Sequence, residues 1–273
     1  MSRGLKAAVI GLVVAGALAV AGPAGAAPTW APAATATVHP GVQTYTEGGQ
    51  CTANFIYYDA SDIYIGQAAH CAGTGEATDT NGCDAGSLPL GTPVEVGGAT
   101  RPGTLAYSSW LTMQGNGEDD ADTCEFNDFA LVRLDPVDHD LVDPSVPFWG
   151  GPTGLVDVTT AGAKVVSYGN SSLRAGVTLL SPKEGVSLRQ SGGGWTHAVA
   201  TVTPGVPGDS GSGFMDKQGR AFGTLSTLQL APLAGSNGVG DLSRELAYLN
   251  ANGPFSVSLA HGTEPFTGPL LPL

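Results

Sequence analysis

Charged residues are scarce in this sequence, and positively charged ones are the scarcest. Only 13% of its 273 residues are Asp, Glu, Lys or Arg, and 11 basic residues oppose 24 acidic ones, which gives a formal net charge of −13 at pH 7. A surface of this sign repels nucleic acids and anionic membranes. Neither is therefore expected as a partner of this protein.

Long apolar runs are lacking beyond the first residues of the chain. Arg3 and Lys6 precede or border the short apolar run Ala7–Ala21, and Ala24–Ala26 reads AGA, a small-residue cleavage site. This order is typical of a secretory signal peptide rather than of a membrane span. Residues 1–26 are therefore predicted to be removed on export, and the mature protein is predicted to be secreted.

Cysteine is also scarce, and its spacing argues against the common zinc sites. The four cysteines include no C-x-x-C pair, the spacing that such sites use. We expect no metal and no cofactor. An even number of cysteines in an exported chain is typical of disulfides, and four of them allow three pairings.

Glycine and proline, by contrast, are abundant, with 41 and 19 residues. This composition favours short strands joined by tight turns over helices. Segments rich in β-branched and aromatic residues recur between turn signals. They are residues 51–58, 63–69, 93–98, 128–134, 163–169, 196–202, 213–219 and 221–230. An all-β fold, either closed or sandwiched, is expected.

One helix is expected near the C-terminus. Asp241 is placed to cap it, Leu242, Leu246 and Leu249 share one face, and Gly253 follows its end.

Two kinds of segment are expected to be irregular. Ala27–Pro40 is rich in Ala, Thr and Pro and is predicted to be poorly ordered. Carboxylates cluster at Glu118–Asp122 and at Asp138–Asp140. Such clusters can bind Ca²⁺, but this spacing fits no defined calcium loop, so a solvated acidic surface is favoured.

Three short motifs carry residues suited to chemistry. Val206–Gly213 reads VPGDSGSG, Gly66–Cys71 reads GQAAHC, and Asn127–Leu134 reads NDFALVRL. Each alone has an ordinary structural interpretation: a surface turn, a structural histidine at the end of a strand, and a polar residue that opens a strand. Together they supply a serine, a histidine and a carboxylate, the groups that nucleophilic catalysis needs.

In this order the three motifs resemble those of the trypsin/chymotrypsin-like serine peptidases. GQAAHC is similar to the family's AAHC motif, NDFALVRL to its D-[IF]-A-L strand, and PGDSGSG to its GDSG loop. The Pro-Gly-Asp-Ser run resembles secreted actinobacterial streptogrisin-like enzymes. The resemblance implies two packed six-stranded antiparallel β-barrels with a C-terminal helix. A short segment, residues 27–41, would precede a first barrel over 42–142 and a second over 143–273.

The resemblance further implies a catalytic triad of His70, Asp128 and Ser210. A serine hydroxyl becomes a good nucleophile only when a base takes its proton. Histidine suits that task because its unperturbed pKa is about 6.5, and the aspartate would orient the imidazole. The N–H groups of Gly208 and Ser210 would form the oxyanion hole. The predicted function is that of a monomeric serine endopeptidase acting on polypeptides.

A substrate pocket is implied as well, and none of its residues is charged. They are Thr203, Pro204, Gly205, Leu225, Ser226 and Gly238. A Lys or Arg side chain in such a pocket would need a countercharge. Cleavage is therefore expected after Leu, Met, Phe or Tyr, with the substrate chain paired to Leu225–Leu228 by β-addition.

For the cysteines, the resemblance implies a disulfide between Cys51 and Cys71. Cys83 and Cys124 then remain as the second predicted pair.

Departures from the family pattern leave a second hypothesis open. Ser212 replaces the second glycine of GDSGG, and no cysteine flanks Ser210 to brace the pocket. Where streptogrisin-like enzymes carry an arginine for the aspartate matching Asp209, this chain offers Ser167 and Tyr168. The alternatives are a protease-like binding protein with little activity, or an esterase that uses the same residues.

Overall fold

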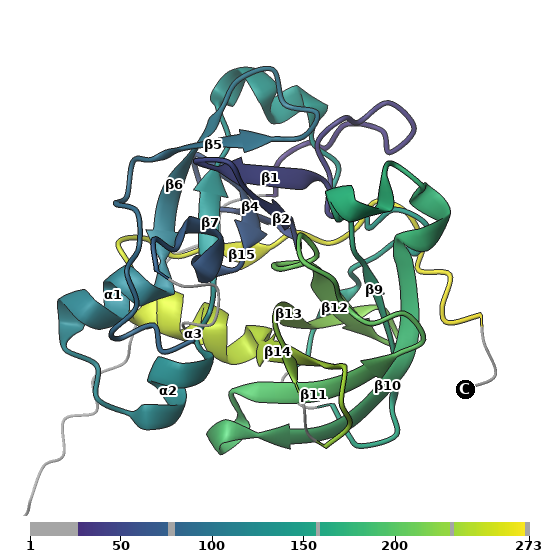
Figure 1. The fold of residues 1–273 in the computed structure, drawn as a ribbon. Helices are drawn as coiled ribbons and strands as arrows, with labels where there is room; N and C mark the ends of the chain where they lie inside the picture. Colours follow the sequence, from purple (N-terminus) through teal and green to yellow (C-terminus); the bar gives the residue numbers. More distant parts are fainter. Residues whose placement is uncertain (1–26, 76–79, 157–158, 230–231, 271–273) are drawn as a thin grey trace, which may run out of the picture.

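The computed structural model describes residues 27–75, 80–156, 159–229 and 232–270. The predicted signal peptide, residues 1–26, lies outside the described residues. Within the described ranges, no helix has the length and apolar character needed to cross a membrane. The fold consists of two β-sheets, one above the other in Figure 1, with a helix running beside both.

The first sheet curls into a barrel. Its strand order is β15-β3-β4-β7-β6-β5-β1-β2. β2 and β3 lie near opposite ends of this order, yet only Ala53–Phe55 separate them along the chain, so the sheet curves back on itself. The strands are β1 (Gln43–Thr46), β2 (Gly49–Thr52), β3 (Ile56–Tyr58), β4 (Ile63–Gln67), β5 (Pro93–Val96), β6 (Gly103–Ser108), β7 (Ala130–Arg133) and β15 (Ser258–Leu259).

The second sheet is a closed barrel. The order β12-β9-β10-β11-β14-β13 is completed by the pairing of β12 with β13, so the six antiparallel strands leave no free edge. β8 (Gly154–Leu155) adds to β13 in parallel. The other strands are β9 (Lys164–Tyr168), β10 (Pro182–Ser191), β11 (Thr196–Thr201), β12 (Gly213–Asp216), β13 (Arg220–Gln229) and β14 (Ser236–Asp241). The predicted all-β fold, with two barrels and a C-terminal helix, is confirmed.

The described residues contain two α-helices that the sequence patterns did not predict. Beside the predicted helix α3 (Leu242–Asn252), whose N-cap Asp241 accepts from the Arg244 N–H, they include α1 (Ser109–Asn116) and α2 (Ala121–Phe126). α1 has little helical periodicity and is held by burial of Trp110 and Met113. The short 3₁₀ turns are η1 (Ala69–Ala72), η2 (Pro136–Leu141), η3 (Ser172–Arg174), η4 (Thr178–Leu180) and η5 (Gly192–Gly194).

The segment before the first barrel is ordered, which corrects the prediction made for Ala27–Pro40. The Ala31 N–H donates to the Val142 carbonyl at 2.9 Å, and Val38 is fully buried and bridges to Val142. Trp30 packs edge-on against Tyr58. Composition predicted disorder here because the segment's backbone partners lie a hundred residues away in the chain.

The chain after α3 crosses back to the first barrel, although it was assigned to the second. β15 pairs with β3, and Phe255 stacks on Tyr64 with ring centroids 4.9 Å apart. Further on, the Glu264 carbonyl accepts from Gly151, and the Leu270 N–H donates to Glu184 of β10. We call residues 254–270 the C-terminal strap, because it contacts both barrels.

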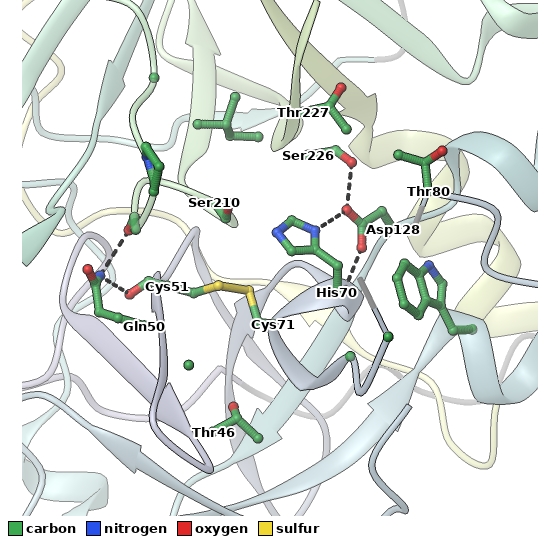
Figure 2. Close-up of a pocket in the computed structure, with 18 of the residues that line it drawn as sticks. Thr46, Gln50, Cys51, His70, Cys71, Thr80, Asp128, Ser210, Ser226 and Thr227 are labelled. Atoms are coloured by element: carbon green, nitrogen blue, oxygen red, sulfur yellow. Dashed lines mark hydrogen bonds and ion pairs between the residues drawn. A yellow bond between two sulfur atoms is a disulfide. The ribbon is translucent and has the colours of Figure 1, made fainter. Parts of the chain in front are cut away.

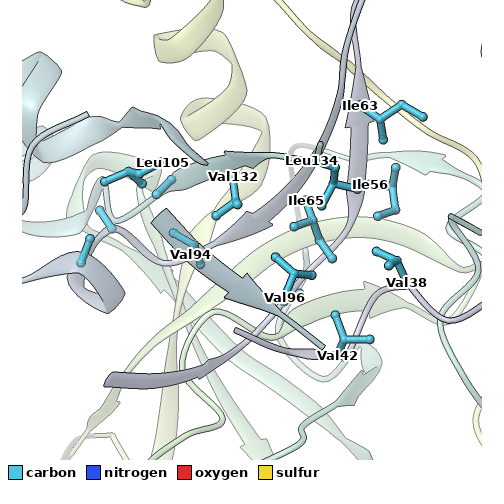
Figure 3. Packing of buried hydrophobic residues seen from close by; sticks show 14 of the residues in the cluster. Val38, Val42, Ile56, Ile63, Ile65, Val94, Val96, Leu105, Val132 and Leu134 are labelled. Carbon is cyan, nitrogen blue, oxygen red and sulfur yellow. The ribbon is translucent and has the colours of Figure 1, made fainter. Parts of the chain in front are cut away.

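Separate apolar cores fill the barrels, and a third lies between them. Figure 3 shows the first-barrel core, built from inward residues such as Ile65, Val94 and Leu105. The core between the barrels combines aromatic rings of the first, such as Tyr107 and Phe129, with apolar residues of the second and of α3. Because this core is continuous, the facing edges of the two barrels are fixed relative to each other.

Candidate active site

A cleft of about 940 Å³ lies between the barrels, and the three predicted triad residues all line it. His70 comes from η1, directly after β4, and Asp128 precedes β7. Ser210 lies in the turn before β12, in the second barrel. In Figure 2, Asp128 and Ser210 lie on opposite sides of the His70 imidazole.

Asp128 is held rigidly and orients the histidine. His70 Nδ1 lies 2.6 Å from Asp128 Oδ2, and the His70 backbone N–H donates to Oδ1 at 2.8 Å. The Ser226 hydroxyl donates to Oδ2 at 2.6 Å. Ser109 fixes the backbone around the carboxylate, because its hydroxyl donates to the Asn127 carbonyl and accepts from the Phe129 N–H. With Nδ1 engaged by a carboxylate, the other nitrogen is left to act as a base.

The local electrostatics match this arrangement. Burial lowers the pKa of His70, but the charge and hydrogen bond of Asp128 outweigh it and raise that pKa above 6.5. Burial raises the pKa of Asp128, yet the charge of His70 and hydrogen bonds from His70 and Ser226 hold it below 3.8. Asp128 is only 3% exposed, so these partners keep it ionised in a poorly solvated position. No hydrogen bond is drawn from Ser210 to the imidazole in Figure 2, a contact that often tightens only when substrate binds.

The loop before Ser210 has a conformation that requires glycine. Gly208 has φ +94°, and a Cβ there would lie 2.2 Å from Oε1 of Gln50. The Gly208 carbonyl accepts from Gln50 at 2.9 Å and from the Thr52 hydroxyl at 2.7 Å. The preceding carbonyl, of Pro207, accepts from the Ser171 hydroxyl at 2.5 Å. The peptide bond between Pro207 and Gly208 is trans, so the Gly208 N–H points in the direction opposite to the Pro207 carbonyl. It therefore points away from Ser171.

Two basic residues hold Asp209, which answers the question that the sequence left open. Arg174 of η3 forms a bidentate ion pair with the Asp209 carboxylate. Lys183 of β10 is fully buried, and its ammonium lies 3.2 Å from Asp209 Oδ2. Burial raises the pKa of Asp209, but Arg174 and Lys183 lower it below 3.8. Neither base lies in Lys164–Ser171, the segment that the resemblance indicated.

Lys183 also fixes Thr203 and Pro204, which with Gly205 form one wall of the predicted pocket. Its ammonium donates to the carbonyls of Thr203 at 3.2 Å and Pro204 at 2.9 Å. The side chain of Asn237, fully buried, accepts from the Gly205 N–H and donates to Val199 and Thr201. These bonds link Thr203–Gly205 to the second barrel, although no cysteine flanks Ser210 to brace the pocket.

Only half of the predicted pocket residues line the cleft. Gly205, Leu225 and Ser226 do so, together with Val206, Pro207, Thr227 and Leu228. Thr203 and Pro204 are exposed residues outside the lining, because their carbonyls turn toward Lys183. Gly238 is also outside the lining. It packs closely against Thr227: a Cβ on Gly238 would lie 2.4 Å from the Thr227 hydroxyl oxygen. The pocket residues were predicted by counting positions from Ser210, which could not reveal that these three residues lie outside the lining of the cleft.

Both predicted disulfides are present. Cys51 is joined to Cys71, beside His70, and Cys83 is joined to Cys124 of α2. Cys51, His70 and Cys71 bring their ligand atoms within 4.8 Å of one another. Because both sulfurs are in a disulfide, this group cannot supply the thiolates that a zinc site would use.

One carboxylate of the acidic clusters is buried, which corrects the prediction of a solvated surface at that residue. Asp138 is fully buried and accepts hydrogen bonds from Thr100 and from the Arg101 N–H, whereas Asp140 of the same cluster is exposed. In the other cluster, Asp120 caps α2 and Glu118 accepts from the Tyr248 hydroxyl.

Comparison with known proteins gives the fold and nothing closer. No family model matches the chain, and no curated protein matches its sequence. Among solved structures, it resembles Thermobifida fusca protease A at 16% identity and a TM-score of 0.50, covering 82% of this chain and 99% of that one. It resembles Nocardiopsis protease at 18% identity and a TM-score of 0.51, covering 81% and 98%. The chain therefore has the fold of the chymotrypsin-like proteases, with its candidate active site in the cleft between the barrels.

Proposed function

We propose that this protein is a secreted serine endopeptidase. The observation that carries the proposal is the convergence of Ser210, His70 and Asp128, from three distant segments, in one cleft. Ser210 Oγ would attack the scissile carbonyl carbon while His70 takes its proton. The same proton would then pass to the leaving amine, and an acyl-enzyme would remain for water to hydrolyse.

Backbone donors would stabilise the tetrahedral intermediate. The N–H groups of Gly208 and Ser210 are the proposed oxyanion hole, since Gln50, Thr52 and Ser171 hold the carbonyls of that loop. A positive charge on His70 would develop beside the Asp128 carboxylate, which favours it.

A fluorophosphonate probe tests the proposal, because it reacts only with an activated serine. We expect labelling of Ser210, lost in Ser210→Ala and in His70→Ala. Each replacement should lower kcat by several orders of magnitude, and the two losses should not add because the triad acts as a unit. A folded protein that binds peptides but takes up no label would favour the alternative, a protease-like binding protein with little activity.

The proposed preference is for cleavage after Leu, Met, Phe or Tyr. The lining residues next to Ser210 on the pocket side are Gly205 to Gly208 and Leu225 to Leu228, which carry no charge. The Lys183 ammonium is engaged by two carbonyls and Asp209, and its side chain is fully buried. Each buried methylene contributes about 0.8 kcal/mol, so the preference should be graded.

Digestion of a peptide library measures this preference. A majority of cuts after Lys or Arg would contradict the proposed pocket. A majority after Glu or Asp would also contradict it, and would indicate that the Lys183 ammonium reaches the substrate side chain.

A further inference from the structure

The cleft continues past His70 and Asp128 into a second hollow, in which Glu125 is the charged side chain among the described lining residues. This hollow, of about 200 Å³, shares Thr80, Ser226 and Thr227 with the main cleft and extends to Phe126, Gln229 and Glu125. Figure 2 shows where it begins, with Thr80 on the side of Asp128 that faces away from Ser210 and Thr227 beyond Ser226. We call it the Glu125 hollow.

Glu125 lines the hollow, and a hydrogen bond holds its carboxylate. It lies near the end of α2, three residues before Asp128, and the Thr80 hydroxyl donates to its Oε1 at 2.7 Å. Glu125 is partly buried, and no ion pair to it is recorded among the described residues. A hydrogen bond from a neutral hydroxyl fixes the carboxylate without neutralising its charge.

The charges along the cleft all favour a cation. The described lining residues of the main cleft and the Glu125 hollow include Glu47, Asp128 and Glu125, but no Lys or Arg. The whole chain has a net charge of −13. A cationic segment would therefore be attracted to the cleft from a distance, and a local countercharge would await one of its side chains.

The direction of the substrate chain assigns this hollow to one side of the scissile bond. On the proposed function, an extended substrate pairs with β13 beyond Ser226. Thr227 and Gln229 of that strand line the Glu125 hollow. Side chains on the N-terminal side of the scissile bond would pass over it.

We propose that the Glu125 hollow is a subsite for a Lys or Arg side chain, located N-terminal to the residue after which the chain is cut. The substrate class is thus a polypeptide with an apolar residue at the cleavage site and a basic residue shortly before it. This inference rests on the proposed function for the direction of the chain, but the binding of the cation can be measured without catalysis.

The first experiment measures binding with Ser210→Ala protein, which cannot form an acyl-enzyme. The fluorescent peptides all contain one Leu. In separate peptides, the second, third or fourth residue before this Leu is Lys, Gln or Glu. At one of these positions we expect Lys to bind about fivefold more tightly than Gln, the size of one partly exposed ion pair. The advantage should disappear when Glu125→Gln is added.

A matched control separates this contact from the general charge of the surface. Asp122 lies on the same helix and lines neither hollow, so Asp122→Asn removes the same charge and should keep the Lys preference. The inference is overturned if the Lys preference survives Glu125→Gln. It is also overturned if Ser210→Ala protein shows no Lys preference.

The second experiment repeats the comparison as kcat/KM with the wild-type serine. If the peptides bind with the Lys preference but are not cut, the proposed catalysis fails while the subsite stands. If they are cut at equal rates whatever the residue before Leu, the subsite fails while the proposed function stands.

Discussion

At the scale of single residues, the candidate site depends on how each polar group is occupied. Asp128 accepts three hydrogen bonds, two from His70 and one from Ser226, and is almost completely shielded from solvent. Its charge is thus kept at low pH and raises the pKa of the histidine beside it. If His70 is the base, as we propose, these shifts set the pH range in which it is neutral.

The first prediction concerns that pH range. Because the base must be neutral, and the pKa of His70 is raised above 6.5, kcat/KM should fall on the acid side with a midpoint above 6.5. In Asp128→Asn the raising causes are gone and burial remains, so the midpoint should move down while kcat drops by about 10⁴-fold. Rate profiles from about pH 5 to about pH 9 measure both effects. An unchanged midpoint in the variant would show that Asp128 does not control the base.

The second prediction concerns Lys183, which sequence reasoning passed over. Lys183→Met removes the ammonium that links Asp209 to the carbonyls of Thr203 and Pro204. Arg174 still pairs with Asp209, so the variant should fold, with a pocket wall that is less well fixed. We expect kcat/KM to fall about tenfold or more for a large apolar residue at the cleavage site, and less for Ala.

Peptides with Phe or Ala at the cleavage site give this ratio. Lys217→Met, at an exposed lysine in the turn between β12 and β13, is the matched control. Equal losses for Phe and Ala peptides would mean that Lys183 contributes only to general stability.

At the scale of elements, α2 connects a disulfide to Asp128 of the proposed triad. Cys124 lies in α2 and is bonded to Cys83, and the Gly82 N–H donates to the Cys124 carbonyl at 2.8 Å. The helix ends at Phe126, directly before Asn127 and Asp128. The disulfide therefore anchors the helix from which Glu125 and the segment leading to Asp128 extend.

The third prediction is that Cys83→Ser with Cys124→Ser lowers the free energy of unfolding by about 2–4 kcal/mol. This corresponds to a fall in Tm of about 5–15 °C for a chain of this size. Thermal denaturation with and without reductant measures it. The Cys51–Cys71 disulfide remains as an internal reference, because reductant should lower the Tm of the double variant further. No change in Tm on losing the bond would contradict the prediction.

At the scale of the whole molecule, the first and last described segments of the chain pack against the barrels. The segment from Ala31 to Val38 bonds to Leu141 and Val142, which follow the last strand that the first barrel contributes before the second. The C-terminal strap pairs with β3 of the first barrel and reaches Glu184 of β10 in the second. The cleft is formed by both barrels, so its width depends on these contacts.

The fourth prediction is that truncation after Gly253 lowers Tm by about 10 °C, since it removes β15, the stacking of Phe255 on Tyr64 and the buried Ala260. KM for long peptides should rise as the barrels become freer to move. Truncation after Gly268 is the control: it removes the Leu270 contact but keeps β15, and should have a much smaller effect. Equal Tm values for the two truncations would show that β15 does not stabilise the fold.

Local sequence was sufficient wherever a residue's role depends on its chain neighbours. The strands next to the three motifs, β4, β7 and β12, were predictable from their residues and turns, and α3 from the cap at Asp241 and its leucine face. The strands β1, β6, β10 and β14 were not predicted, and the single segment predicted over residues 51–58 is divided between β2 and β3. The three motifs gave His70, Asp128 and Ser210 because the local backbone of each motif presents one side chain. Gly208 belongs to this group as well, since its positive φ is a property of the loop itself.

Only the tertiary structure decided which distant groups meet. Arg174 and Lys183 reach Asp209, Asn237 holds Gly205, and Thr80 orients Glu125, each across a gap that no local pattern encodes. The order of residues 27–40 and the strap's return to the first barrel were hidden for the same reason. The sequence by itself determined the chemistry present and the strands that present it. The pairing of buried charges, and hence the shape of the pocket, followed from packing, because a buried charge takes whatever partner the fold brings within reach.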